Sequence, residues 1–268
     1  MICIVVTGCA TPTERIEQLA GEHGFARLEL EGRGFRHVAF ATDLAISSEA
    51  LHVYVEHDGS PWLEGGTRIA ADPTPRVPLA LELMSVDRGP RLYLGRPCYL
   101  GKAAVEACNP ALWTYRRYAP EVVDSMVSAL ARFLDDHPYR RVVLIGHSGG
   151  GTLAWLMARD ARQVSHVFTI AANLDVDEWT RFHGFSPLRG SLNPADMPDL
   201  PPEILQVHYA GGRDDQVPPR IVEAFARTHG RARAIIIRPF DHVCCWAREW
   251  PGLLTPLESA SPSGLARQ

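Results

Sequence analysis

Residues 142–151 have the sequence VVLIGHSGGG, in which a run of apolar residues leads directly into a glycine-rich turn. The apolar run is mostly β-branched, which is typical of a buried strand. Residues 152–158 (TLAWLMA) follow and have the composition of a helix. A Gly-x-Ser-x-Gly motif between a strand and a helix predicts a nucleophile elbow, a sharp turn that exposes the Ser148 hydroxyl at the end of a sheet.

The glycines of this motif have a physical role. The turn forces the serine into strained backbone angles, so the residues two before and two after it must lack a clashing Cβ. The following helix directs free N–H groups toward the site, which favours an oxyanion there. The alternative is an ordinary glycine-rich turn that contains a serine, and the flanking strand and helix disfavour it.

The composition is that of an ordinary soluble protein. The chain has 268 residues, 46% hydrophobic and 22% charged, with a formal net charge of −4. This is sufficient for one large α/β domain with a substantial core. Arginine pairs such as Arg116-Arg117 are scattered and are assigned to solvated surface, so we expect no nucleic-acid partner. No apolar run approaches the roughly 18 residues of a membrane-spanning helix.

The chain divides into residues 1–24, a domain at residues 25–255, and a tail at residues 256–268 that we expect to be disordered. The first segment contains Val-Thr-Gly-Cys, which resembles the lipobox of bacterial lipoproteins and would make Cys9 a lipid anchor. The positive charges and longer apolar stretch of a signal are missing. Two interpretations stay open: a truncated lipoprotein of the cell envelope or periplasm, or a chance match in a cytoplasmic protein.

The element pattern predicts an α/β fold. Two short strands joined by a hairpin signal and a third strand come first, and helices then alternate with strands. Counting gives eight strands, which predicts a mostly parallel sheet with helices on both faces. The expected strands lie at residues 26–30, 35–41, 51–56, 91–95, 141–145, 164–171, 204–209 and 232–238, and the expected helices at residues 77–86, 119–136, 149–162 and 219–228.

Residues 173–202 interrupt this alternation. They are rich in Pro, Asn and Asp, with Trp179, Phe182 and Phe185 interspersed. A long irregular insertion after a strand end favours a lid or a wall of the substrate site. The alternative is a surface loop whose aromatic side chains only fix it to the domain.

A serine nucleophile needs a general base, and the base needs an orienting acid. Residues 211–219 (GGRDDQVPP) follow a strand and precede a helix, which places an aspartate in the turn. We favour Asp214 as the acid and keep Asp215 as the alternative, since Asp215 is also suited to capping the next helix. The best base is His242, which follows the last strand. As the neighbour of Ser148 in the elbow, His147 should direct its side chain away from it.

The oxyanion hole needs two N–H donors. Gly149, directly after the nucleophile, supplies one. The second should come from the loop after the third strand, residues 57–62 (HDGSPW), where the N–H of Gly59 or Ser60 is expected. Pro61 has no N–H. The alternative for this loop is a simple turn.

The cysteines leave two alternatives for one pair. Cys98 and Cys108 bracket a short loop and form either a disulfide in an oxidising compartment or two buried thiols. Cys244 and Cys245 are adjacent and have no assigned partner. Together with His242 they do not suggest a metal site, because adjacent cysteines cannot easily converge on one ion. We therefore expect no metal and no organic cofactor.

The chain resembles the α/β-hydrolase superfamily over residues 25–255. Ser148, Asp214 and His242 follow one another in the order of nucleophile, acid and base that is typical of this superfamily. Within it, four segments resemble a group of bacterial hydrolases that often carry lipoprotein-type N-termini. That resemblance implies export and a Cys98–Cys108 disulfide, although His57 replaces a glycine of the group. The segments are residues 54–59 (YVEHDG), 71–75 (ADPTP), 96–99 (RPCY) and 241–246 (DHVCCW).

These features predict a serine hydrolase that cleaves a carboxylic ester or related acyl bond in a small-molecule substrate through an acyl-enzyme. A thioesterase, amidase or acyltransferase would use the same residues, because the triad does not specify the leaving group. A non-catalytic binding protein on the same fold is a further alternative, but such a protein would normally have lost a member of the triad.

Overall fold

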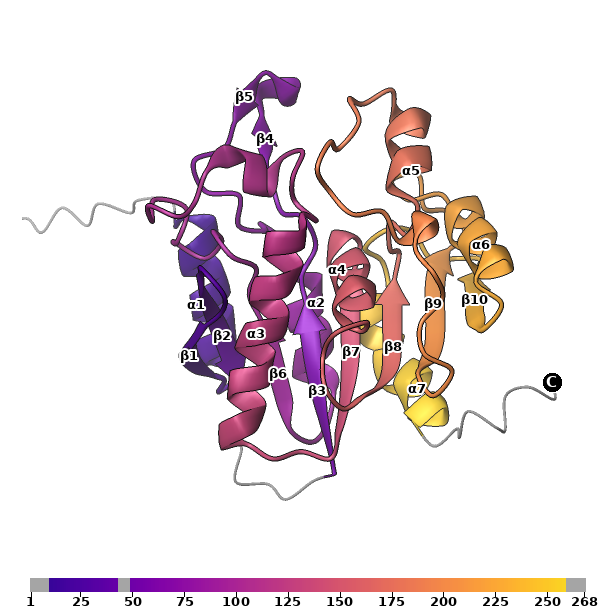
Figure 1. Cartoon of the computed structure of the whole chain (residues 1–268), viewed down its shortest axis with the longest axis horizontal. Coiled ribbons are helices and arrows are strands. Elements are labelled where there is room, and N and C mark those ends of the chain that lie inside the picture. Colours follow the sequence, from indigo (N-terminus) through magenta and orange to yellow (C-terminus); the bar gives the residue numbers. More distant parts are fainter. Residues whose placement is uncertain (1–9, 43–48, 259–268) are drawn as a thin grey trace, which may run out of the picture.

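The computed structural model describes residues 10–42 and 49–258, and its centre is one eight-stranded sheet (Figure 1). The strands are β1 (Ala26–Glu31), β2 (Arg36–Ala41), β3 (Ala50–Val55), β6 (Arg91–Leu94), β7 (Arg141–His147), β8 (Val164–Ile170), β9 (Leu205–Gly211) and β10 (Ala232–Ile237). Their order in the sheet is β1-β2-β6-β3-β7-β8-β9-β10. Strand β2 is antiparallel to both of its neighbours, and the strands from β6 to β10 are parallel. The predicted eight-stranded, mostly parallel sheet is confirmed.

Helices cover both faces of the sheet, as predicted. One face carries α3 (Pro120–Asp136), α4 (Gly149–Met157) and α6 (Pro219–Thr228), and the other carries α2 (Leu79–Val86) and α7 (Trp246–Glu258) (Figure 1). On the first face, the Trp155 ring of α4 meets the Phe225 ring of α6 at 5.6 Å between centroids. On the second, Trp250 Nε1 donates a hydrogen bond to Tyr54 Oη. Because both faces are covered, β7 is apolar along its length rather than alternating.

Helix α1 (Pro12–Glu22) was not expected in the N-terminal segment. Thr11 caps it, and Glu14 completes a capping box with the Thr11 backbone. Ile16 and Ala20 are buried against the domain, so the folded part begins before residue 25. Cys9 and residues 259–268 lie outside the described residues. In the parts that the structure describes, no helix has the length and apolar character needed to cross a membrane.

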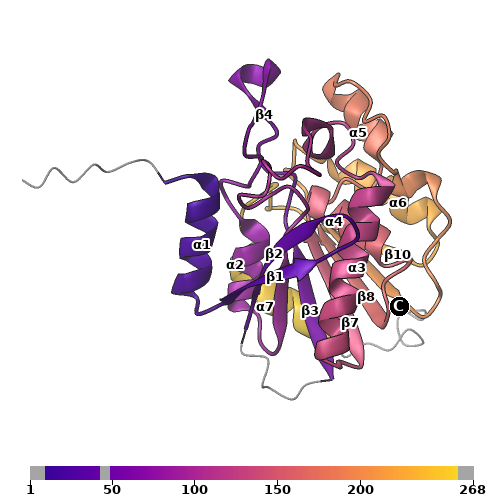
Figure 2. The same cartoon turned by 60° about the vertical axis from the view of Figure 1, so that its left-hand side comes forward.

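Two further elements rise above the ends of the parallel strands, and the sequence pattern did not predict them (Figures 1 and 2). The first is a small antiparallel pair, β4 (Trp62–Leu63) and β5 (Arg68–Ile69). The second is helix α5 (Val176–His183), which lies inside the insertion that was expected to be irregular. The Asp175 side chain caps α5, and Gly184 ends it in a left-handed conformation with φ 66°.

Two pairs of cysteines form disulfide bonds. Cys98 and Cys108 form a disulfide with an S–S distance of 2.04 Å. Cys244 and Cys245, for which we had no assignment, are bonded to each other. The first of these bonds closes the loop that follows β6, and the second lies in the turn that carries His242.

A buried histidine links strand β2 to helix α3. His37 Nδ1–H donates to the Gly95 carbonyl at 2.8 Å, and its Nε2 accepts from Ser125 Oγ at 2.8 Å. These are the roles of the two nitrogens in the neutral ring. Burial lowers the pKa of His37 to about 4, because the charged form would lose its hydration.

We expect His37 to make stability depend on pH. Between about pH 6.5 and 4 the unfolded chain binds a proton at this residue and the native protein does not. Stability should therefore fall as pH falls, by about 1.4 kcal/mol per pH unit from this residue. Urea unfolding at pH 7.5 and 5 should show a smaller loss for His37→Gln than for the wild type. His23→Gln, at an exposed histidine, is the control and should keep the wild-type slope. Equal slopes in all three proteins would contradict the assignment.

Candidate active site

The sharp turn at Ser148 lies between β7 and α4, as expected. Ser148 has φ 51° and ψ −124°, a strained conformation for a residue with a Cβ, and its N–H donates to the Ile170 carbonyl at 2.8 Å. A Cβ on Gly146 would lie 2.2 Å from the Gly150 carbonyl oxygen, and a Cβ on Gly150 would lie 2.2 Å from the Val55 carbonyl oxygen. Both glycines are therefore required for the turn to pack against β3 and α4.

Asp214 and His242, the expected acid and base, contact each other. His242 Nδ1–H donates to Asp214 Oδ2 at 2.8 Å. The other carboxylate oxygen, Oδ1, accepts N–H bonds from Gln216 at 2.9 Å and Val217 at 2.8 Å. Both side chains are buried, whereas the alternative acid Asp215 is exposed. The turn after β9 thus directs Asp214, and not its neighbour, toward the turn after β10.

One pocket brings Ser148 and His242 together. Its volume is about 270 Å³, and it lies above the ends of the parallel strands. Trp179 and Gln216 form part of its wall, and so does His57 from the loop after β3. The three predicted catalytic side chains therefore come from three strand ends that the parallel sheet places at one edge.

His147 has a position that sequence reasoning did not foresee. Its side chain also lines this pocket, and its Nε2–H donates to the His242 carbonyl at 3.0 Å. The two rings are 4.9 Å apart between centroids. Burial lowers the pKa of His147 to about 4, so the ring is neutral near pH 7. His147 therefore supports the backbone of the residue proposed as base.

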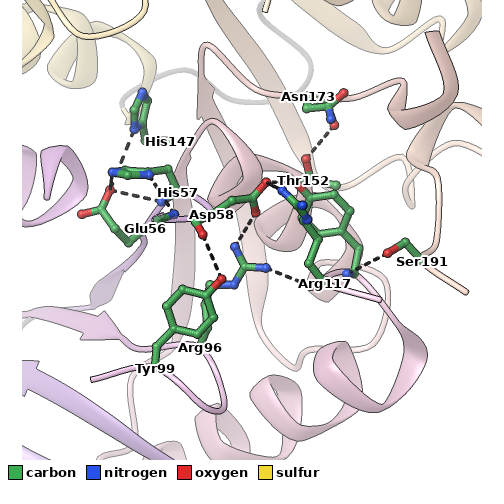
Figure 3. Close-up of polar contacts among 12 residues, drawn as sticks. Glu56, His57, Asp58, Arg96, Tyr99, Arg117, His147, Thr152, Asn173 and Ser191 are labelled. Atoms are coloured by element: carbon green, nitrogen blue, oxygen red, sulfur yellow. Dashed lines mark hydrogen bonds and ion pairs between the residues drawn. The ribbon is translucent and has the colours of Figure 1, made fainter. Parts of the chain in front are cut away.

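Glu56, His57 and His147 form a buried cluster, with potential metal-ligand atoms within 4.8 Å of one another (Figure 3). Hydrogen bonds already occupy both nitrogens of His57: Nε2–H donates to the Val77 carbonyl at 2.9 Å, and Nδ1 accepts from the Gly59 N–H at 3.0 Å. Glu56 Oε1 accepts the His57 N–H at 3.1 Å. The cluster therefore connects the loop after β3 to the segment before α2 and does not offer three free ligands.

The loop after β3 corrects the expected second oxyanion donor. The Gly59 N–H is bound to His57 Nδ1, and the Ser60 N–H donates to the Pro73 carbonyl at 2.9 Å. A Cβ on Gly59 would lie 1.9 Å from the same carbonyl oxygen, so this glycine serves the close approach of two backbones. The Asp58 N–H, one residue earlier, has no hydrogen-bond partner among the described residues. It is the remaining donor of this loop.

The Asp58 carboxylate lies at the centre of a buried ionic network (Figure 3). Its Oδ1 accepts from Arg96 Nη1 at 2.5 Å, and its Oδ2 accepts from Arg117 Nη1 at 2.9 Å and from Tyr118 Oη at 2.6 Å. Burial alone would raise the pKa of Asp58, but the two guanidinium groups outweigh it and hold the pKa well below its usual range. The carboxylate is therefore ionised near neutral pH.

This network packs directly against Gly149, the residue after Ser148. A Cβ on Gly149 would lie 2.1 Å from Asp58 Oδ1 and 2.5 Å from Tyr118 Oη. Only glycine leaves room for the carboxylate here. The contact joins the loop after β3 to the N-terminus of α4, and these two segments carry the free N–H groups of Asp58 and Gly149.

Several residues of the site were not identified from the sequence. Glu56 and Arg96 follow the ends of parallel strands, a position typical of functional side chains, and this signal could have indicated them. Tyr118 lies before α3 and has no such signal. Arg117 is not the solvated surface residue that the scattered arginine pairs indicate, because it is buried and its Nε–H donates to the Thr114 carbonyl.

Comparisons with known proteins agree with this architecture. A family model described as alpha/beta hydrolase fold matches residues 108–192, and no curated protein matches the chain. An esterase of Pyrococcus furiosus is 13% identical, with a TM-score of 0.62 over 95% of this chain and 96% of its own. A serine hydrolase of Xanthomonas campestris, described as lacking a lid, is 12% identical, with a TM-score of 0.57 over 91% of this chain and 94% of its own.

A third structure, a bacterial membrane phospholipase A, is 15% identical, with a TM-score of 0.57 over 93% of this chain and 92% of its own. At such low identities the similarity concerns the path of the backbone and not the substrate. It extends over nearly the whole chain in each case. The chain has the α/β-hydrolase fold.

Proposed function

We propose that the protein is a serine hydrolase that cleaves a carboxylic ester through an acyl-enzyme. The observation that carries this proposal is the strained turn at Ser148, which shares one pocket with a His242 ring held by Asp214. The order of these residues along the chain is that of nucleophile, acid and base in hydrolases of this fold.

In the acylation step, Ser148 Oγ attacks the carbonyl carbon of the ester, and His242 Nε2 takes the hydroxyl proton. His242 then gives this proton to the departing alkoxide, and the acyl group stays on Ser148. Because Asp214 accepts the Nδ1–H bond, it keeps the free lone pair on Nε2 and stabilises the imidazolium that forms. In the second step, His242 activates a water that releases the acid and restores Ser148.

The oxyanion of each tetrahedral intermediate would be held by the N–H groups of Gly149 and Asp58. Gly149 is the first residue of α4, so the helix dipole adds to the attraction for a negative oxygen. The Asp58 side chain is anionic, but Arg96 and Arg117 neutralise it, so the loop does not repel the oxyanion. This assignment replaces the Gly59 and Ser60 donors expected from the sequence.

The same residues would serve a thioesterase, an amidase or an acyltransferase, and a binding protein is the non-enzymatic alternative. Proteins that share this fold are named as an esterase, a phospholipase and a puromycin-hydrolysing peptidase. Both members of the acid–base pair are present and hydrogen-bonded, which disfavours a protein that only binds.

Fluorophosphonate labelling tests the nucleophile. The wild type should be labelled, and Ser148→Ala should not be, with turnover of a p-nitrophenyl ester reduced about 10⁶-fold. Asp214→Asn should lower kcat by about 10⁴-fold because it presents the wrong imidazole tautomer. Asp215→Asn is the matched control at the neighbouring exposed aspartate and should behave as the wild type. An unlabelled wild type, or labelling of Ser148→Ala at the wild-type rate, would overturn the proposal.

The contact between Asp58 and Gly149 provides a second test. In Gly149→Ala the added methyl would displace the Asp58 carboxylate and misplace both proposed donors, and kcat should fall by about 10²-fold. The control is Gly21→Ala on α1, where the methyl would meet nothing within 4 Å. Circular dichroism should show both variants folded. A folded Gly149→Ala with wild-type kcat would exclude the assigned pair of donors.

A further inference from the structure

A second and larger cleft lies beside the catalytic pocket. Its volume is about 870 Å³, compared with about 270 Å³ for the pocket that contains Ser148 and His242. Three residues line both spaces, namely Pro61, Arg117 and Trp179. The cleft therefore adjoins the catalytic pocket and shares part of its wall.

The two elements that the sequence pattern did not predict supply the walls of this cleft. Trp62 of β4 and the glycines of the turn that follows it form one wall, and Trp179 of α5 with Phe185 and Leu188 forms the opposite wall. Figures 1 and 2 show both elements projecting above the sheet. Residues far apart in the chain therefore face a common space at the strand ends.

The lining is mainly apolar and aromatic. Phe185 is 54% exposed, Tyr115 49% and Trp62 43%, so a large area of aromatic surface faces solvent. Among the described residues of the lining, Arg117 is the one charged side chain, and it is bound to the Asp58 carboxylate and the Thr114 carbonyl. A pocket of this size with an apolar lining is typical of a binding site for an organic ligand.

The aromatic wall is held in place before any ligand binds. Trp179 Nε1–H donates to the Gln216 carbonyl at 2.9 Å, and its ring meets that of Phe185 at 5.4 Å between centroids. Gln216 itself lines the catalytic pocket. A preformed aromatic surface binds an apolar group at a small cost in conformational entropy.

We propose that this cleft binds a large apolar group of the substrate, aromatic or long aliphatic, joined to the ester whose carbonyl lies at Ser148. The inference rests on the proposed hydrolase function and specifies its substrate class. An apolar group in the cleft would remove the exposed aromatic surface from water. A short acyl ester such as an acetate would occupy the catalytic pocket alone and leave this surface exposed.

The test measures selectivity as the ratio of kcat/KM for a large substrate to kcat/KM for a matched small one. For the acyl side, p-nitrophenyl 4-phenylbutyrate is compared with p-nitrophenyl acetate. For the alcohol side, 4-phenylphenyl acetate is compared with phenyl acetate. The wild type should favour the larger substrate of one pair by about tenfold or more in kcat/KM, and that pair identifies which side of the ester enters the cleft.

Variants then connect this preference to the cleft. Trp62→Ala and Phe185→Ala should each lower the selectivity ratio about tenfold, because the large group loses an aromatic contact. Ser186→Trp, which would fill the cleft from its rim, should lower the ratio at least as much. Phe182→Ala is the matched control, since Phe182 is 44% exposed on α5 but does not line the cleft, and it should keep the wild-type ratio.

The outcomes separate the two proposals. If the wild type turns over the small esters but prefers neither large substrate, or if Trp62→Ala, Phe185→Ala and Ser186→Trp all keep the wild-type ratio, the cleft assignment is wrong and the hydrolase function stands. An equal fall in Phe182→Ala would also overturn the cleft assignment, because the effect would then come from α5 as a whole. Absence of both fluorophosphonate labelling and ester turnover in the wild type would instead reject the hydrolase function.

Discussion

The geometry of the site depends on the contacts of the buried Asp58 carboxylate. It accepts bonds from Arg96, Arg117 and Tyr118 and at the same time packs against the Cα of Gly149. A buried charge is tolerated only when partners surround it, so its removal from this position would leave two guanidinium groups uncompensated. The loop after β3, the loop after β6 and the segment before α3 are therefore held in one arrangement around the start of α4.

A buried neighbour also holds the backbone of His242, the proposed base, in place. His147 Nε2–H donates to the His242 carbonyl, and its Nδ1 makes no hydrogen bond among the described residues, with Glu56 Oε1 lying 3.8 Å away. Glu56 is in turn held by the His57 N–H. The turn with His242 is thereby connected to the strand that leads to Ser148, and the His57 ring of the loop after β3 packs against the same His147 ring at 5.4 Å between centroids. Contacts of this kind set the relative positions of Ser148, His242 and the loop with Asp58.

Most of the regular elements could be predicted from local patterns. The strands at the centre of the sheet are apolar runs covered on both faces, and α6 begins and ends where its proline and periodicity indicate. Helix α5 was missed because eight residues among prolines and asparagines carry little periodic signal. The β4–β5 pair was missed because two residues per strand show no alternation. Helix α1 was missed because the apolar residues before it suggested a leader segment.

The sequence by itself determined the positions of Ser148, Asp214 and His242, the residues proposed as nucleophile, acid and base, because each follows a strand end and parallel strands bring their carboxyl ends to one edge. Tertiary structure decided the rest. The hydrogen bond of the Ser60 N–H to the Pro73 carbonyl, the burial of Arg117 and the aromatic cleft all depend on contacts between segments that are separated in the chain. Asp58 and Arg117, for example, are 59 residues apart. Contacts made on folding decide which N–H group stays free and which charged side chain is buried. No local sequence pattern encodes these contacts.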